Sequence, residues 1–117
     1  MKTLKIDSCS FGSIIINGET YSDDLVILPD GAILKPWWRK RGHQLTMDDL
    51  QKLIDSSSEV IVVGIGVNGR VIPDKNLKSD LAKLGIELIA IPNKEAIKVF
   101  NELALEKRIG GGFHLTC

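Results

Sequence analysis

The feature that most restricts the fold is a run of four β-branched residues, Val60 to Val63, with no polar residue among them. Such a run is typical of a strand that is covered on both faces. Farther along, leucines recur at the helical spacing i, i+4 and i+7 from Leu77, Gly85 is placed to end that helix, and a second apolar strand is predicted at 86–91. Strand, helix and strand within about 30 residues form a βαβ unit, for which we expect parallel strands and a right-handed crossover.

The first third of the chain predicts two antiparallel hairpins. The apolar run 14–16 and the return strand at 20–21 flank Asn17 and Gly18, a pair that tolerates the positive φ angles of a tight turn. A second apolar run, 25–28, meets a proline-aspartate-glycine turn before apolar residues resume at 32–34. These hairpins would extend the layer formed by the parallel strands.

Two further helices complete the predicted fold. Thr46 and Asp49 make a capping-box-like start to the first, and the last begins with Asn93 as its cap and runs to Lys107. The three glycines at 110–112 then release the chain into a short terminal strand or an ordered tail. We therefore predict an α/β fold: a single compact domain over residues 1–117, in which N-terminal antiparallel hairpins and a C-terminal parallel βαβ unit form a mixed sheet with helices on its faces.

Length and charge exclude several classes of protein. A chain of 117 residues is long enough for one domain with a core but not for two independent domains. Lys and Arg total 15, as do Asp and Glu, so no net charge attracts the chain to nucleic acid or an acidic membrane. There is no apolar run of about 18 residues. Cys9 and Cys117 form no C-x-x-C pair, and the first residues resemble no export signal or organelle presequence, so we expect a reduced, cytoplasmic protein. A reactive Cys117, or a bond between the two thiols, is the less favoured alternative.

The loop after the 60–63 strand matches the pattern G-x-G-x-x-G through Gly64, Gly66 and Gly69. In a dinucleotide-binding loop the third glycine lies in the first turn of a helix, whereas here residues 70–73 precede any helical periodicity, and Glu87 begins the second strand instead of ending it. We therefore predict a glycine turn and no cofactor. The alternative is a small anionic ligand held by the loop amides with Arg70 nearby.

Residues 37–43, WWRKRGH, place two tryptophans among cationic side chains. Aromatic faces beside guanidinium groups can anchor a protein partner or stack nucleic-acid bases. The neutral net charge favours a protein partner and no nucleic acid, with Trp37, Trp38 and Arg39 as binding residues. The competing structural interpretation is that one tryptophan seals the core while the arginines remain solvated.

Asn101 falls on the apolar stripe of the last helix, where its amide must find hydrogen-bond partners. The favoured interpretation is that it pins a loop to the helix; alternatively, Asn101, Glu106 and Arg108 line a cleft that holds a carboxylate or phosphate. His43 and His114 are too isolated in the sequence to predict a metal site or a base–nucleophile pair. We predict no catalytic residue and no metal site.

Several segments resemble the adipogenesis-associated domain family of small α/β proteins, to which a mitochondrial complex I assembly factor also belongs. The resemblance spans nearly the whole chain, and it is carried by Phe11-Gly12, Tyr21, Pro29 and Gly31, Trp38-Arg39, Gly64 and Gly66, Phe100-Asn101 with Leu103, and the tail RIGGGFHLTC from Arg108 to Cys117. The tail is more similar to the vertebrate cytoplasmic branch than to the assembly-factor branch. The resemblance implies a mixed sheet with helices on its faces, no established catalytic activity, and roles in differentiation or complex assembly.

The sequence thus favours a non-catalytic interaction or assembly-factor-like module whose partner is a protein. Its contact surface is expected at the 37–43 loop and the C-terminal tail. The alternative is a binder of a small anionic ligand, or a weak enzyme, with a cleft between the Gly64–Arg70 loop and the face that carries Asn101 and Arg108. Neither hypothesis involves a membrane.

Overall fold

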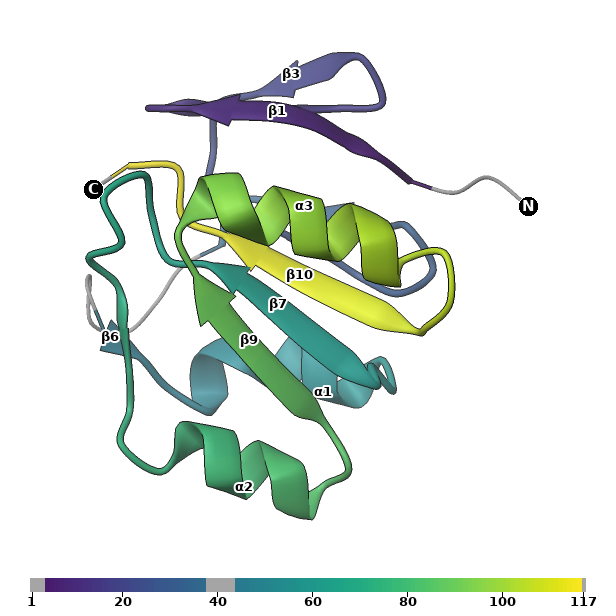
Figure 1. Cartoon of the computed structure of the whole chain (residues 1–117), viewed down its shortest axis with the longest axis vertical. Helices are drawn as coiled ribbons and strands as arrows, with labels where there is room; N and C mark the ends of the chain where they lie inside the picture. Colours follow the sequence, from purple (N-terminus) through teal and green to yellow (C-terminus); the bar gives the residue numbers. More distant parts are fainter. Residues whose placement is uncertain (1–3, 38–43, 117) are drawn as a thin grey trace.

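The computed structural model describes residues 4–37 and 44–116 and is built around a five-stranded mixed sheet (Figure 1). Its three parallel strands are β10, β7 and β9, and β4 pairs antiparallel with β10. The strand order is β5 (Ile33–Leu34), β4 (Leu25–Ile27), β10 (Ile109–Phe113), β7 (Val60–Gly64) and β9 (Glu87–Ile91). The predicted α/β fold with antiparallel hairpins and a parallel βαβ unit is therefore confirmed.

A smaller antiparallel sheet forms a separate layer. It contains β1 (Ile6–Ser10), β2 (Ser13–Ile16) and β3 (Glu19–Tyr21). The helix α3 (Asn93–Leu103) lies between the two sheets, whereas α1 (Gln51–Asp55) and α2 (Leu77–Lys83) cover the opposite face of the large sheet (Figure 1). Contrary to the prediction, the first hairpin does not extend the large sheet; it covers α3.

The run Val60 to Val63 is buried on both faces, as predicted, because it separates two hydrophobic cores. Val60 and Val62 pack with α3 and the small sheet, while Ile61 and Val63 pack with α1 and α2. This alternation follows from the two-residue period of a strand. The central strand therefore fixes the separation of the α3 layer from the α1–α2 layer.

Both predicted hairpins form. Asn17 (φ 50°) and Gly18 (φ 81°) make the turn between β2 and β3, and Gly31 (φ 92°) lies in the turn between β4 and β5. The strand β1 was not predicted, because only Ile6 of its five residues is fully buried and its sequence is mostly polar. A two-residue parallel ladder between β6 (Gln44–Leu45) and β8 (Ile72–Pro73) was also not predicted.

The glycines at 110–112 do not release the chain; they form the middle of β10, a central and fully buried strand. The prediction was wrong because side chains from both cores pack directly on this backbone. A Cβ added to Gly110 would lie 2.7 Å from a methyl carbon of Leu53, and one added to Gly112 would lie 2.9 Å from the Trp37 ring. Only glycine leaves room for such close packing.

The helix boundaries also differ from the prediction in part. The predicted contact between Thr46 and Asp49 forms, since the amide and hydroxyl of Thr46 both donate to Asp49 Oδ2, but Met47 and not Thr46 occupies the cap of the short 3-10 turn (Asp48–Leu50) that leads into α1. Similarly, Pro92 and not Asn93 occupies the cap of α3, which ends at Leu103 and not at Lys107. Among the described helices, none is long and apolar enough to cross a lipid bilayer.

Candidate functional site

The parallel strands β7, β9 and β10 all end at one edge of the large sheet, which we call the carboxyl edge. The chain leaves β7 toward α2 on one face and leaves β9 toward α3 on the other (Figure 1). In open α/β sheets, a point at which neighbouring connections diverge in this way is the usual place for a ligand. The side chains at this edge are therefore the first candidates for a functional site.

Asn93 fills the gap between the ends of β7 and β9. Its side-chain Oδ1 accepts a hydrogen bond from the backbone amide of Gly66 at 3.1 Å, and its backbone amide donates to the Gly66 carbonyl at 3.2 Å. Its Nδ2 donates to the carbonyl of His114 at 2.7 Å and to Cys9 Sγ at 3.5 Å. Asn93 is only 2% exposed. It therefore connects three segments: the loop after β7, the residue after β10, and strand β1. It also fills the point between β7 and β9 where a ligand would have to bind.

The glycine loop has a structural explanation at Gly64 and Gly66. A Cβ on Gly64 would overlap Oδ1 of Asn93 and lie 2.6 Å from the Phe113 ring, so this position has no space for a side chain. Gly66 adopts φ 109°, a conformation that other residues rarely adopt. The helix α2 begins only at Leu77, so its first turn does not contain the loop glycines, in agreement with the prediction. Arg70 at the end of the loop is exposed.

A partly buried histidine–carboxylate pair also lies at the carboxyl edge. His114 Nδ1 is 2.7 Å from Asp24 Oδ2, and Asp24 Oδ1 accepts a hydrogen bond from the Leu115 amide at 2.8 Å. Thr116 Oγ1 is 3.4 Å from His114 Nε2. Hydroxyl, imidazole and carboxylate in this order are the groups of a general-base site. Here the pair also fastens the C-terminal segment to the residue that precedes β4.

No local pattern in the sequence marks this pair, because its members are separated by 90 residues. Only the placement of β4 beside β10 brings Asp24 and His114 together. Sequence reasoning considered Cys9 only as a free thiol or a disulfide partner and did not identify its contact with Asn93, which donates to the half-buried thiol. Burial raises the pKa of the Cys9 thiol, and the hydrogen bond from Asn93 lowers it by less.

Asn101 and Arg108 do not face the glycine loop. Asn101 accepts a hydrogen bond from the Ile6 amide at 2.9 Å and donates to the Ile6 carbonyl at 2.8 Å, so it pins β1 to α3. The Arg108 side chain donates to the carbonyls of Ser56 and Ser57. Its backbone precedes β10 beside Glu59, whereas Gly64 ends β7. The expected cleft between the loop and Arg108 is therefore wrong, because the two lie at opposite ends of the parallel strands.

Trp37 is 8% exposed and seals the core that contains α1 and α2. Its Nε1 donates to the Asp49 carbonyl at 3.0 Å, and its ring packs on Gly112. The structural interpretation of the tryptophan pair is correct for this residue, so Trp37 does not form part of a contact surface. The tail segment 109–115 is buried as well. Trp38, Arg39 and His43 lie outside the described residues.

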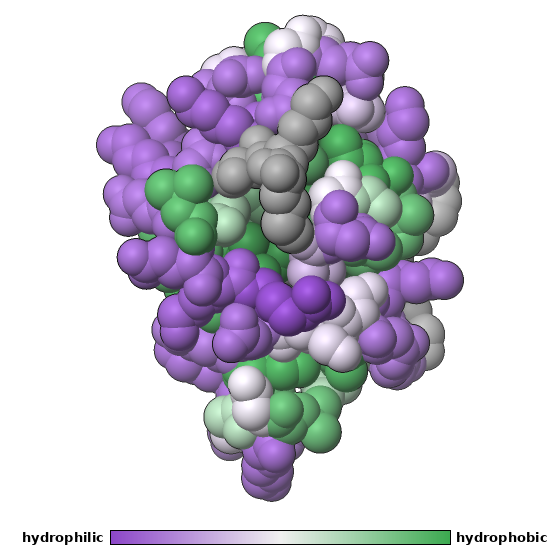
Figure 2. Space-filling model, turned by 90° about the vertical axis from the view of Figure 1, so that its right-hand side faces the viewer, coloured by the Kyte–Doolittle hydropathy of each residue, from purple (hydrophilic) through white to green (hydrophobic). Residues whose placement is uncertain are grey.

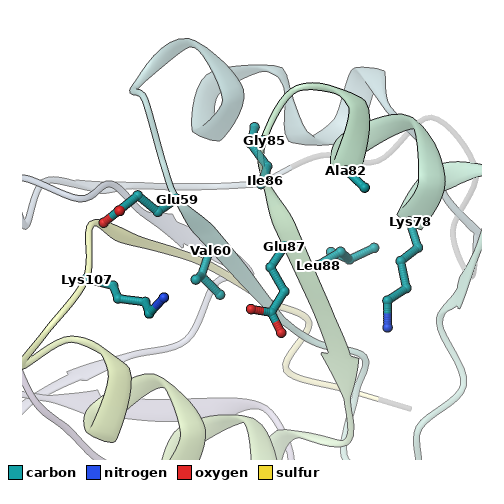
Figure 3. Close-up of a pocket in the computed structure, with 9 residues that line it drawn as sticks. All are labelled: Glu59, Val60, Lys78, Ala82, Gly85, Ile86, Glu87, Leu88 and Lys107. Atoms are coloured by element: carbon teal, nitrogen blue, oxygen red, sulfur yellow. The ribbon is translucent and has the colours of Figure 1, made fainter.

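A surface cleft of about 440 Å³ lies at the opposite end of the sheet, where β7 and β9 begin (Figure 3). Lys78 and Ala82 of α2 form one side, and Lys107 approaches from the segment before β10. Val60, Ile86 and Leu88 contribute apolar surface to the lining, beside two carboxylates, those of Glu59 and Glu87. Figure 2 shows the end of the molecule at which the parallel strands begin: hydrophilic residues cover most of it, and hydrophobic residues gather in separate patches. The cleft therefore offers charges of both signs beside apolar surface.

The described part of the chain contains no cluster of three histidine, cysteine or acidic residues that could hold a metal ion. At the carboxyl edge, Asn93 already accepts the hydrogen bond of the Gly66 amide, so this donor is not directed at a cofactor phosphate. Among the described residues, the closed carboxyl edge and the open cleft beside β9 are thus two candidate sites.

Known proteins share this sequence pattern and fold. The family described as "Protein of unknown function (DUF498/DUF598)" matches residues 6–114. The chain is similar to conserved hypothetical protein PH1505 from Pyrococcus horikoshii OT3, with 31% identity over 97% of this chain and 99% of the other and a TM-score of 0.84. It is also similar to MT938, with 28% identity, the same two coverages and a TM-score of 0.81. A Mth938-like domain from Bordetella pertussis has the same fold at 17% identity, a TM-score of 0.71 and coverages of 97% and 86%.

Proposed function

This chain belongs to the DUF498/DUF598 family of proteins of unknown function, and we propose that it is a non-catalytic interaction module that binds an extended protein segment along the free edge of β9. A role in complex assembly, of the kind that the resemblance of its sequence implies, requires such a contact. The proposal moves the expected contact surface away from Trp37 and the buried tail to the cleft beside α2.

The observation that carries the proposal is the position of β9 at the end of the strand order. The Glu87 amide donates to Glu59, and the Ile91 carbonyl accepts from Ile65, so residues 87, 89 and 91 direct their backbone groups toward β7. Backbone groups of successive residues point to opposite edges of a strand, so the amides and carbonyls of Leu88 and Ala90 point away from β7. Within residues 4–37 and 44–116, no other strand pairs with β9 on that side. An exposed row of such groups is a template for strand addition.

The cleft adds side-chain contacts to this backbone edge. Leu88 contributes to the lining, next to Lys78 and Ala82 of α2 (Figure 3). Strand addition obtains affinity from main-chain hydrogen bonds and specificity from pockets for alternate side chains. Lys78 and Glu87 can thus select the charges of the bound segment, while the apolar lining residues accept an aliphatic side chain.

The closed carboxyl edge supports a non-catalytic role. Asn93 occupies the divergence point between β7 and β9, and its hydrogen bonds use the Gly66 amide and the His114 carbonyl. A small substrate would have to displace a side chain that is 2% exposed. Such an exchange would leave buried polar groups without partners, at a cost of about 1 to 3 kcal/mol for each.

Proline at position 90 tests the proposal, because it removes the outward-facing amide and leaves the bonds to β7 intact. The immobilised wild-type chain should retain a protein partner from a lysate of cells that express it, and Ala90→Pro should reduce retention by about tenfold or more. Ala90→Ser keeps the amide at similar size and is the matched control. Circular dichroism and thermal melting establish that both variants are folded. Equal retention by the two folded variants contradicts strand addition at β9.

A small anion at the Gly64–Arg70 loop is the alternative proposal, and the exposed Arg70 at the carboxyl edge supports it. Inorganic phosphate at 100 times its dissociation constant would stabilise the fold by about 2.7 kcal/mol, a thermal shift of several degrees. Arg70→Ala should abolish that shift, whereas Lys83→Ala, on an exposed position of α2, should preserve it. A wild-type chain that melts at the same temperature with and without phosphate removes this alternative.

A further inference from the structure

The free edge of β9 is short, and its outward backbone amides and carbonyls are arranged symmetrically about the middle of the strand. Leu88 and Ala90, the two residues with outward backbone groups, flank Ile89 at the centre of the five-residue strand. We propose that the segment bound at this edge is β9 of a second copy of the chain, antiparallel and related by a two-fold axis at Ile89. This inference rests on the function proposed above, because it names the occupant of the same edge.

Two-fold pairing satisfies all of the outward groups. In an antiparallel ladder, two residues opposite each other exchange both of their N–H···O bonds at every second position. An axis at Ile89 places Leu88 of one copy opposite Ala90 of the other, and this pair occurs twice. The four outward amide and carbonyl pairs would thus form four hydrogen bonds, and the sheets of both copies would join into one ten-stranded sheet. Open sheets of about ten strands do occur in large α/β proteins.

The side chains beside the axis are compatible with a second copy. Ile89 packs against the α3 core but is only half-buried, so part of its side chain remains accessible. At a position without exchanged hydrogen bonds, opposite Cα atoms approach to about 4.5 Å, so the two Ile89 side chains would touch. On the other face, Ala90 is small and also half-buried, which leaves room beside α2 for Leu88 of the second copy.

The charges along the edge are complementary under the same axis. Antiparallel pairing places the start of one β9, which carries the exposed Glu87, beside the end of the other, where α3 begins at Asn93. The amino end of a helix attracts carboxylates, and the exposed Lys94 and Glu95 there offset each other in charge, so the attraction comes from the helix end itself. Net charge is zero, so two copies do not repel each other at long range. The attraction of Glu87 to the helix end, together with the symmetry of the outward backbone groups, favours a second copy over an unrelated extended segment.

Sedimentation velocity gives the first test. The wild-type chain and Ala90→Ser should sediment as a dimer at tens of micromolar, with twice the 12.9 kDa mass of the chain, while folded Ala90→Pro should remain a monomer. A wild-type chain that is monomeric up to about 0.5 mM overturns the inference, since the dimer would then be weaker than specific interfaces commonly are.

A symmetric disulfide tests the register. In a background of Cys9→Ser and Cys117→Ser, Ile89→Cys should form a covalent dimer under mild oxidation, because the expected separation of the opposite Cα atoms lies within the range for a disulfide. Leu105→Cys, at a position that is 72% exposed and outside β9, is the matched control and should form far less dimer. Equal yields at the two positions overturn the proposed axis.

The two proposals fail differently. If the wild-type chain is monomeric but retains a different protein in a manner that depends on the Ala90 amide, the second-copy inference is wrong and strand addition stands. If neither self-association nor Ala90-dependent retention is observed, both are wrong.

Discussion

Gly64 and Asn93 are packed so closely that a single carbon added to Gly64 would overlap Oδ1 of Asn93. The same oxygen accepts the hydrogen bond from the Gly66 amide at 3.1 Å. The two residues therefore depend on each other: the absence of a side chain at Gly64 leaves space for the side-chain amide of Asn93, the first residue of α3. The Asn93 side chain thus fills the position where sheets of this kind usually bind ligands.

Gly64→Ala should destabilise the fold by about 1 to 3 kcal/mol, because the added methyl overpacks a buried site. The nearest atoms belong to Asn93 and Phe113, so the cost should decrease when Asn93 is shortened. In Gly64→Ala combined with Asn93→Ala, urea denaturation should give a loss smaller than the sum of the single losses. Additive losses would contradict direct contact between the two positions.

Asn93→Ala should cost about 1 to 3 kcal/mol for each buried group that loses its partner, namely the Gly66 amide and the His114 carbonyl. Asn93→Asp separates the two contacts, since it keeps an acceptor for Gly66 but places a carboxylate against the His114 carbonyl. Lys94→Ala, at the exposed neighbouring position, should change stability by less than about 0.5 kcal/mol. Urea midpoints measure all three, and an Asn93→Ala midpoint equal to that of Lys94→Ala would contradict the structural role of Asn93.

Asn101→Ala should loosen β1 from α3, with a loss of about 1 to 3 kcal/mol, because both backbone groups of Ile6 lose their partner. Hydrogen exchange measures this locally: the Ile6 amide should exchange faster than in the wild-type chain, while β7 amides in the central sheet change less. Glu102→Ala changes the exposed neighbouring position and serves as the control. Unchanged exchange at Ile6 would show that the small sheet does not depend on this side chain.

The sequence could predict those parts of the fold whose signals are local. The β-branched run at 60–63, the leucine spacing from Leu77 and the Asn17-Gly18 turn each depend on neighbouring residues only, and each formed as expected. The strand β10 could not be recognised in the same way. Its glycines are in a strand because Leu53, Trp37 and Phe100 approach them from distant segments, and glycine has low strand propensity on its own.

The candidate site was less predictable for the same reason. Asn93 is a residue type that often caps helices, but its side chain accepts a hydrogen bond from Gly66, which is 27 residues away in the sequence, instead of from an amide of its own helix. Asp24 and His114 become neighbours only when β10 inserts beside β4. The predicted role of Asn101, pinning another segment to the helix, is confirmed, because a half-buried amide needs hydrogen-bond partners. Its partner Ile6 could not be identified from the sequence.

The Cys9 thiol provides a probe of the carboxyl edge, since burial raises its pKa above the ordinary value and the Asn93 hydrogen bond lowers it by less. In a Cys117→Ser background, alkylation by iodoacetamide should be slower than for a small peptide thiol, and its rate should rise only at a higher pH, because the thiolate is the reactive form.

Asn93→Leu removes the bond that favours the thiolate while a side chain of similar size keeps the thiol covered, so in this folded variant the alkylation profile should move to still higher pH. The same raised pKa favours the folded state while the thiol is protonated; this contribution is complete below the unfolded-state pKa and is lost as the pH rises through the folded-state pKa. A profile that matches the peptide thiol would mean that Cys9 is not held beneath Asn93, and that the carboxyl edge is open to solvent there.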